Sequence, residues 1–88
     1  MPLLALDLPL VQSCATWIVE NAKPARAALG LFNMLKPIRE LEIHEIASLD
    51  RDARVAMLKR ALAGESIGLM SDAGCPGVAD PGSEIVAL

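Results

Sequence analysis

The stretch that decides the fold is Ser66 to Glu84, which reads S-I-G-L-M-S-D-A-G-C-P-G-V-A-D-P-G-S-E. Its apolar start, Ile67 to Met70, is typical of a short buried strand. A loop of small residues follows. Asp80 and Pro81 then indicate a helix start, with Asp80 as the N-cap and Pro81 at the first helical position, where no N–H is needed. The stretch therefore predicts a strand, a loop across the carboxyl end of that strand, and a helix.

Two interpretations of this loop, Ser71 to Gly77, are open from the residues alone. In open α/β sheets, ligands bind just beyond the carboxyl ends of the strands. Gly74 and Gly77 lack a Cβ, so a ligand can approach the backbone closely there. Glycine and proline also mark ordinary tight turns, however, and a glycine spacing by itself is a loose signal of binding.

Strands and helices alternate outward from this stretch. Runs of strand-forming or apolar residues predict strands at Ala15 to Glu20, Arg39 to Ile43 and Ser66 to Met70. Helical spacing and start signals predict helices from Asp7, over Ala22 to about Leu31, over Arg51 to Ala63, and from Pro81 onward. The order α-β-α-β-α-β-α predicts an α/β fold with a mainly parallel sheet and right-handed crossovers.

Capping signals predict where these helices begin and end. Asn21 is expected to cap the second helix, and Ser48 or Asp50 the third. Gly64 stands where a left-handed residue commonly closes a helix. The basic residues of the third helix are expected on its outer face: Arg51, Arg54, Lys59 and Arg60.

Composition limits the class of protein. An apolar content of 53% is high for 88 residues, so we expect one small partial domain that is marginally stable alone. A net charge of −3 argues against a basic nucleic-acid surface on this segment, although RNA stays possible as a substrate. No apolar run reaches the length of a membrane span, no secretory signal is evident, and two cysteines make no disulfide framework. We therefore expect a cytoplasmic protein without a membrane segment.

The stretch S-D-A-G-C-P-G-V-A-D-P-G-S-E resembles the S-D-A-G-T-P-x-x-x-D-P-G-x-E signature of the tetrapyrrole methylase superfamily. Within it, the similarity is to the branch of bacterial small-subunit ribosomal RNA cytidine 2′-O-ribose methyltransferases. A second segment, Trp17 to Asn21 followed by Lys23 to Arg26, is similar to that branch's strand ending in E-D-T-R. The resemblance spans roughly Leu10 to Leu88.

The resemblance implies an S-adenosylmethionine-dependent methyltransferase, acting on rRNA ribose or on a small-molecule acceptor and forming a homodimer in the complete protein. It implies that the loop residues line the cofactor site: Ser71, Asp72, Ala73, Gly74, Cys75, Pro76 and Gly77. Substrate contacts are expected from Glu20, Asn21 and Lys23. The family's opening strand, with its Pro-containing loop, and its second domain have no counterpart here. We therefore expect residues 1–88 to be one partial cofactor domain, inactive in isolation.

Several features keep a second class of function open. Asn21 stands where the family has Asp, and the family's following Thr-Arg is lost, which puts the rRNA substrate in doubt more than the cofactor. Cys75 stands where the family has Thr, a change that costs little for cofactor binding. Asp72 is equally explained as a residue that caps its own loop. His44 has no second ligand at metal-binding spacing, so no metal site is expected, and no catalytic residue can be assigned. The alternative is an α/β fragment or interaction module that binds no cofactor.

Overall fold

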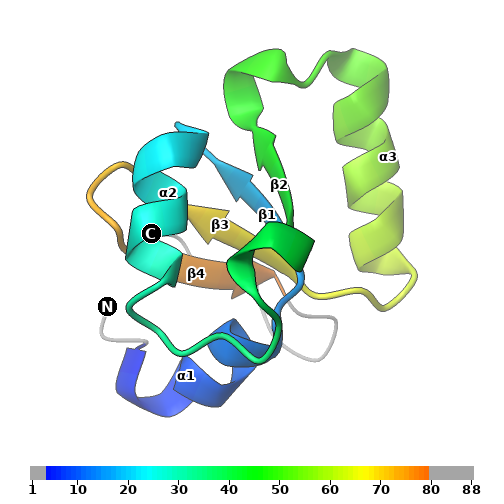
Figure 1. Ribbon diagram of the computed structural model, residues 1–88. Coiled ribbons are helices and arrows are strands. Elements are labelled where there is room, and N and C mark those ends of the chain that lie inside the picture. The colour runs from blue at the N-terminus through cyan, green and yellow to red at the C-terminus, as the bar shows by residue number, and fades with distance from the viewer. Residues whose placement is uncertain (1–3, 80–88) are drawn as a thin grey trace.

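A computed structural model describes residues 4–79, with helices and strands alternating over most of that range (Figure 1). The helices are α1 (Leu4–Ser13), α2 (Ala22–Leu29) and α3 (Arg51–Leu62). The strands are β1 (Thr16–Val19), β2 (Glu42–Glu45), β3 (Ile67–Met70) and β4 (Pro76–Ala79). Two short 3-10 helices, Ile38–Glu40 and Ile46–Ser48, flank β2. The predicted helix from Pro81, with its cap Asp80, lies outside the described residues.

The four strands form one mixed sheet in the order β2-β1-β3-β4. β1 pairs in parallel with both β2 and β3, which confirms the predicted parallel pairing of these three strands. β4 pairs antiparallel with β3 and was not predicted, so the expected loop ends earlier. Pro76 is the first residue of this edge strand. Proline is tolerated there because its missing N–H removes no hydrogen bond that the sheet needs.

Two predicted element boundaries are wrong. β2 begins at Glu42 rather than Arg39, because the chain after Pro37 first closes a 3-10 turn, in which the amide of Glu40 donates to the Pro37 carbonyl at 2.9 Å. The first helix was expected to begin at Asp7, but Asp7 lies inside α1, which continues through Pro9.

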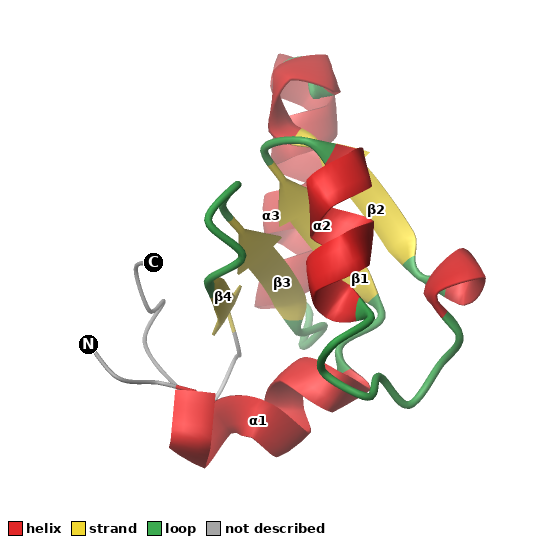
Figure 2. Cartoon of the chain, turned by 60° about the vertical axis from the view of Figure 1, so that its left-hand side comes forward, coloured by secondary structure: helices red, strands yellow, loops and turns green. Residues whose placement is uncertain are grey.

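The sheet carries helices on both faces, with α2 in front of it and α3 behind it in Figure 2, while α1 lies across one end. The main core lies on the α2 side and consists of Val11, Cys14, Trp17, Val19, Ala25, Leu29, Met70 and Val78. Trp17 is fully buried, and its indole N–H donates to the Cys14 carbonyl at 2.9 Å. The indole ring lies over Gly68 of the neighbouring strand.

Helix α3 follows its predicted signals at both ends. The carboxylate of Asp50 accepts a hydrogen bond from the Ala53 amide at 2.8 Å, which confirms Asp50 as the N-cap. Gly64 has a φ of 116°, the left-handed conformation expected after the helix end. No helix within residues 4–79 is long and apolar enough to cross a membrane.

The predicted outer face of α3 holds for three of its four basic residues, which are exposed, and is wrong for Arg60, which is half-buried. Arg54 donates to the carbonyls of Leu49 and Ile46 at 2.9 and 3.1 Å and holds the preceding turn. Arg60 reaches Glu42 on β2 and Glu65 beyond the helix end. Arg60 therefore lies against the sheet between two carboxylates, whereas Arg54 stays exposed while it binds the turn before the helix.

Candidate functional site at the carboxyl edge of the sheet

The carboxyl ends of the three parallel strands meet at one edge of the sheet. Val19, the last residue of β1, lies in register with Glu45 on β2 and with Met70 on β3. The residues that follow, Glu20 and Ser71, therefore leave the sheet side by side. This is the edge at which ligands bind in α/β proteins, and it gathers predicted substrate and cofactor residues in one place.

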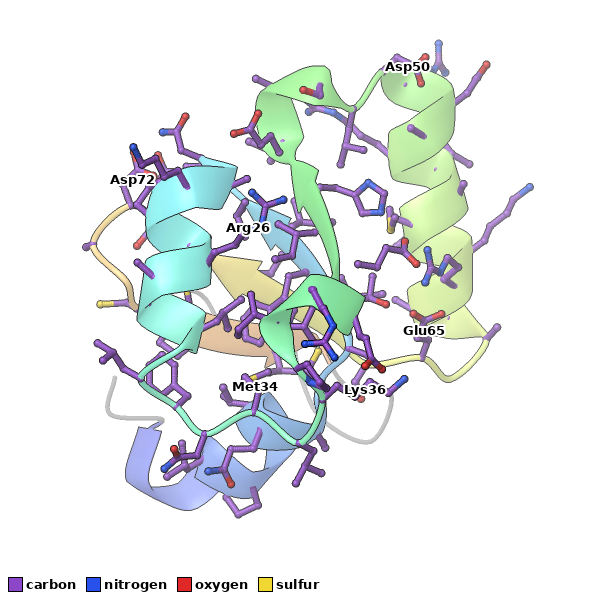
Figure 3. All side chains as sticks on the ribbon, in the orientation of Figure 1. Arg26, Met34, Lys36, Asp50, Glu65 and Asp72 are labelled. Carbon is purple, nitrogen blue, oxygen red and sulfur yellow. The ribbon has the colours of Figure 1, made fainter. Side chains whose placement is uncertain are left out.

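Three of the predicted site residues form a hydrogen-bonded cluster at this edge. The amide of Asp72 donates to Glu20 Oε1 at 2.8 Å, and the side-chain amide of Asn21 donates to Asp72 Oδ2, also at 2.8 Å. Figure 3 shows Asp72 beside the start of α2. The cluster joins the end of β1 to the loop after β3, although its members lie about fifty positions apart in the chain.

Glu45 completes the edge and supplies the capping hydrogen bond at the start of α2. Its carboxylate accepts a hydrogen bond from the Ala22 amide, the first in α2, at 2.8 Å. Asn21 holds the N-cap position of α2, as predicted, but its side chain makes no capping hydrogen bond and donates to Asp72 instead. Glu45 was not predicted as a site residue, because the strand was expected to end at Ile43, two residues earlier.

The edge carries negative charge that no ion pair within the described residues neutralises. Glu20, Glu45 and Asp72 contribute three carboxylates, and none of them forms an ion pair with any residue in the described range 4–79. Lys23, the remaining predicted substrate residue, is the second residue of α2, is exposed, and has no ion-pair partner within the same range. Charge of one sign at a protein edge attracts ligands of the opposite sign.

The loop after β3 is a tight turn. The amide of Gly74 donates to the Ser71 carbonyl at 3.0 Å, and Gly74 has a φ of 77°, a conformation that glycine adopts without strain. Cys75 is exposed. Pro76 and Gly77 are buried in β4, so only Ser71 to Cys75 of the seven predicted cofactor residues lie in the loop itself. A side chain at position 74 would strain this turn whether or not a ligand binds.

A shallow hollow opens beside this cluster on the α3 side of the sheet. It has a volume of about 170 Å³, and it is lined by Ile18, Val19, Glu20, Ile46, Leu69, Met70 and Ser71. Its wall is apolar apart from Glu20 and Ser71. An apolar hollow with a few polar groups on one side is the usual form of a small-molecule site.

A second charged cluster lies on the α3 side, at the other end of the strands. Arg60 donates to Glu65 Oε2 at 2.6 Å and to Glu42 Oε1 at 3.1 Å, and it also reaches the Thr16 hydroxyl at 3.2 Å. Figure 3 shows Glu65 just beyond the last turn of α3. The hydrogen bonds from Arg60 and from His44 lower the pKa of Glu42 to about 2. The charges of Arg60, Glu42 and Glu65 are paired with one another, so this cluster holds α3 against the sheet.

Within residues 4–79, no three His, Cys, Asp or Glu side chains gather in a way that could hold a metal ion. Cys14 is buried, donates to the carbonyls of Thr16 and Ser66, and has a pKa raised by burial, which makes it a poor nucleophile.

Fold and edge together define a small α/β protein with a mixed four-stranded sheet and an acidic carboxyl edge. Comparisons with protein-family models, with curated proteins and with solved structures found no match.

Proposed function

We propose that this chain is a segment of an S-adenosylmethionine-dependent methyltransferase whose cofactor binds at the acidic carboxyl edge of the sheet. The observation that carries the proposal is the set of unpaired carboxylates, Glu20, Glu45 and Asp72, around the ends of β1, β2 and β3. S-adenosylmethionine carries a sulfonium cation and ribose hydroxyls, both of which are stabilised next to carboxylates. The resemblance of the Ser71 to Glu84 stretch supports the same cofactor.

The way α2 begins favours a cationic ligand over a phosphate. A helix N-terminus at the carboxyl edge of an α/β sheet is commonly an anion site, because its free amides and its dipole attract negative charge. Here the Glu45 carboxylate already accepts from the Ala22 amide at 2.8 Å. A phosphate would therefore meet three carboxylates and an amide that already donates to Glu45. This argues against a nucleotide diphosphate at this edge.

The residues present fit part of the cofactor. Glu20 and Asp72 each use one carboxylate oxygen in the cluster, which leaves the other oxygen able to accept from a ribose hydroxyl. The hollow of about 170 Å³ is smaller than the roughly 300 Å³ at which small-molecule sites begin. This chain would thus hold only a portion of the ligand, and we expect weak binding.

The proposed methyl acceptor is a ribose hydroxyl of ribosomal RNA, on the strength of the family resemblance. Methyl transfer from a sulfonium depends chiefly on holding donor and acceptor in line at short distance. The exposed Lys23 lies next to the acidic edge and would contact a phosphate of such an acceptor. Its role is a substrate contact and not a catalytic one.

Chemical-shift mapping on the isotopically labelled chain tests the proposal. Titration with S-adenosylmethionine should perturb the amides of Glu20 to Ala22 and Ser71 to Gly74, and leave those of α3 unchanged. Glu20→Gln should weaken binding, whereas Glu40→Gln, an exposed glutamate before β2, should not. If the amides at the edge do not shift, or if Glu20→Gln and Glu40→Gln bind equally well, the alternative of an α/β module that binds no cofactor is favoured.

A further inference from the structure

Helix α3 carries an exposed apolar stripe along one side of the helix. Val55, Leu58 and Leu62 are 43%, 55% and 77% exposed, and their spacing of three and four residues places them on one face. Met57, on the opposite face, is buried. In Figures 1 and 2 this helix forms the outer layer on its side of the sheet. Contiguous exposed apolar surface of this kind marks an interaction site.

The stripe is continuous with an apolar groove between α3 and the sheet. The groove measures about 220 Å³, and Ile18, Leu49, Met57, Leu58, Ile67 and Leu69 contribute to its lining. Leu58 belongs both to the groove and to the stripe, and Ile46, which is 44% exposed, lies at the groove wall. The apolar surface therefore extends beyond the three stripe residues.

Two opposite charges flank the stripe in a self-complementary arrangement. Asp52 and Lys59 are both exposed, and neither forms an ion pair within the described part of the chain. They are seven residues apart, almost two helical turns, and so lie on the same flank. If two copies of α3 pack antiparallel through the stripe, Asp52 of each faces Lys59 of the other.

We propose that α3 is a self-association surface through which two copies of this chain pair as a two-fold dimer with antiparallel α3 helices. The arrangement forms the Asp52–Lys59 contact twice, as a two-fold axis requires. It also opposes the two helix dipoles, so that each N-terminus lies beside the other copy's C-terminus. Three side chains form a smaller surface than a standard interface, so we expect a weak dimer. This inference is independent of the proposed cofactor site.

Sedimentation of the full chain over a range of concentrations tests the pairing. Asp52→Lys and Lys59→Asp should each weaken the dimer about tenfold or more, because each change creates two like-charge contacts. Mixed in equal amounts, the two variants should form a heterodimer, since every Asp52–Lys59 contact then joins opposite charges again. Lys36→Asp, an exposed charge change in the loop before β2, should leave the dimer unchanged.

Circular dichroism of each variant checks that α3 still forms, because both swaps oppose the helix dipole. If a swap unfolds the helix, the neutral pair Asp52→Asn and Lys59→Gln replaces it and should remove the salt dependence of dimerisation. A chain that stays monomeric at every concentration would overturn the proposal. So would a dimer that is insensitive to both charge changes, or a mixture that remains monomeric; the stripe would then serve a different partner.

Discussion

Trp17 and Gly68 set a strict packing constraint in the core at the scale of single residues. A Cβ on Gly68 would lie 2.4 Å from the Trp17 ring, and Trp17 is fully buried. We expect Gly68→Ala to lower the free energy of unfolding by about 2 kcal/mol, because the indole must shift within a packed core. Gly30→Ala is the matched control: its Cβ would approach no atom closer than 3.4 Å. Chemical denaturation that finds the two equal would contradict this packing.

Glu42 gives the fold a pH dependence at the same scale. Arg60 and His44 lower its pKa from 4.5 to about 2. A carboxyl with a lower pKa in the folded chain stabilises the fold above its unfolded pKa, and this contribution is lost as the pH falls towards the folded pKa. Urea denaturation between about pH 5 and pH 2 should therefore show a loss of stability that is smaller in Glu42→Gln. An equal loss in both proteins would mean that the Arg60 contact contributes nothing.

At the scale of elements, the N-cap of α3 is a separable contribution to stability. Asp50 accepts from the Ala53 amide at 2.8 Å. Removing this bond with Asp50→Ala should cost about 1 kcal/mol, whereas Asp50→Asn, which can still accept, should cost much less. Thermal denaturation of the two variants measures the difference. Equal melting temperatures would show that α3 is held by its tertiary contacts alone.

The elements also show what the sequence can and cannot predict. The strands at Thr16–Val19 and Ile67–Met70 were predictable because buried parallel strands are continuous apolar runs. β4 was not, because Pro76 and Gly77 have the composition of a turn and acquire strand geometry only by pairing with β3. The start of β2 was misplaced because Arg39 and Glu40 close a local 3-10 turn that periodicity does not reveal.

For the molecule as a whole, part of the candidate site could be predicted from the sequence and part could not. The parallel order of β1 and β3 brings Glu20, Asn21 and Asp72 together, so part of the edge followed from the topology. Glu45 was missed because its role depends on the register of β2, which moved when that strand's boundary moved. The apolar stripe on α3 was likewise hidden, because helical spacing alone does not reveal which face meets the sheet.

We propose that the carboxyl edge selects a cationic ligand, and the charge of the ligand can be varied without changing the rest of it. Calorimetric titration at low ionic strength should compare S-adenosylmethionine with S-adenosylhomocysteine, which lacks the sulfonium charge. With three unpaired carboxylates at the edge, we expect S-adenosylmethionine to bind at least about threefold more tightly, a preference that shrinks with added salt and in Glu20→Gln. Equal or reversed affinities, or no binding of either compound, would contradict the account.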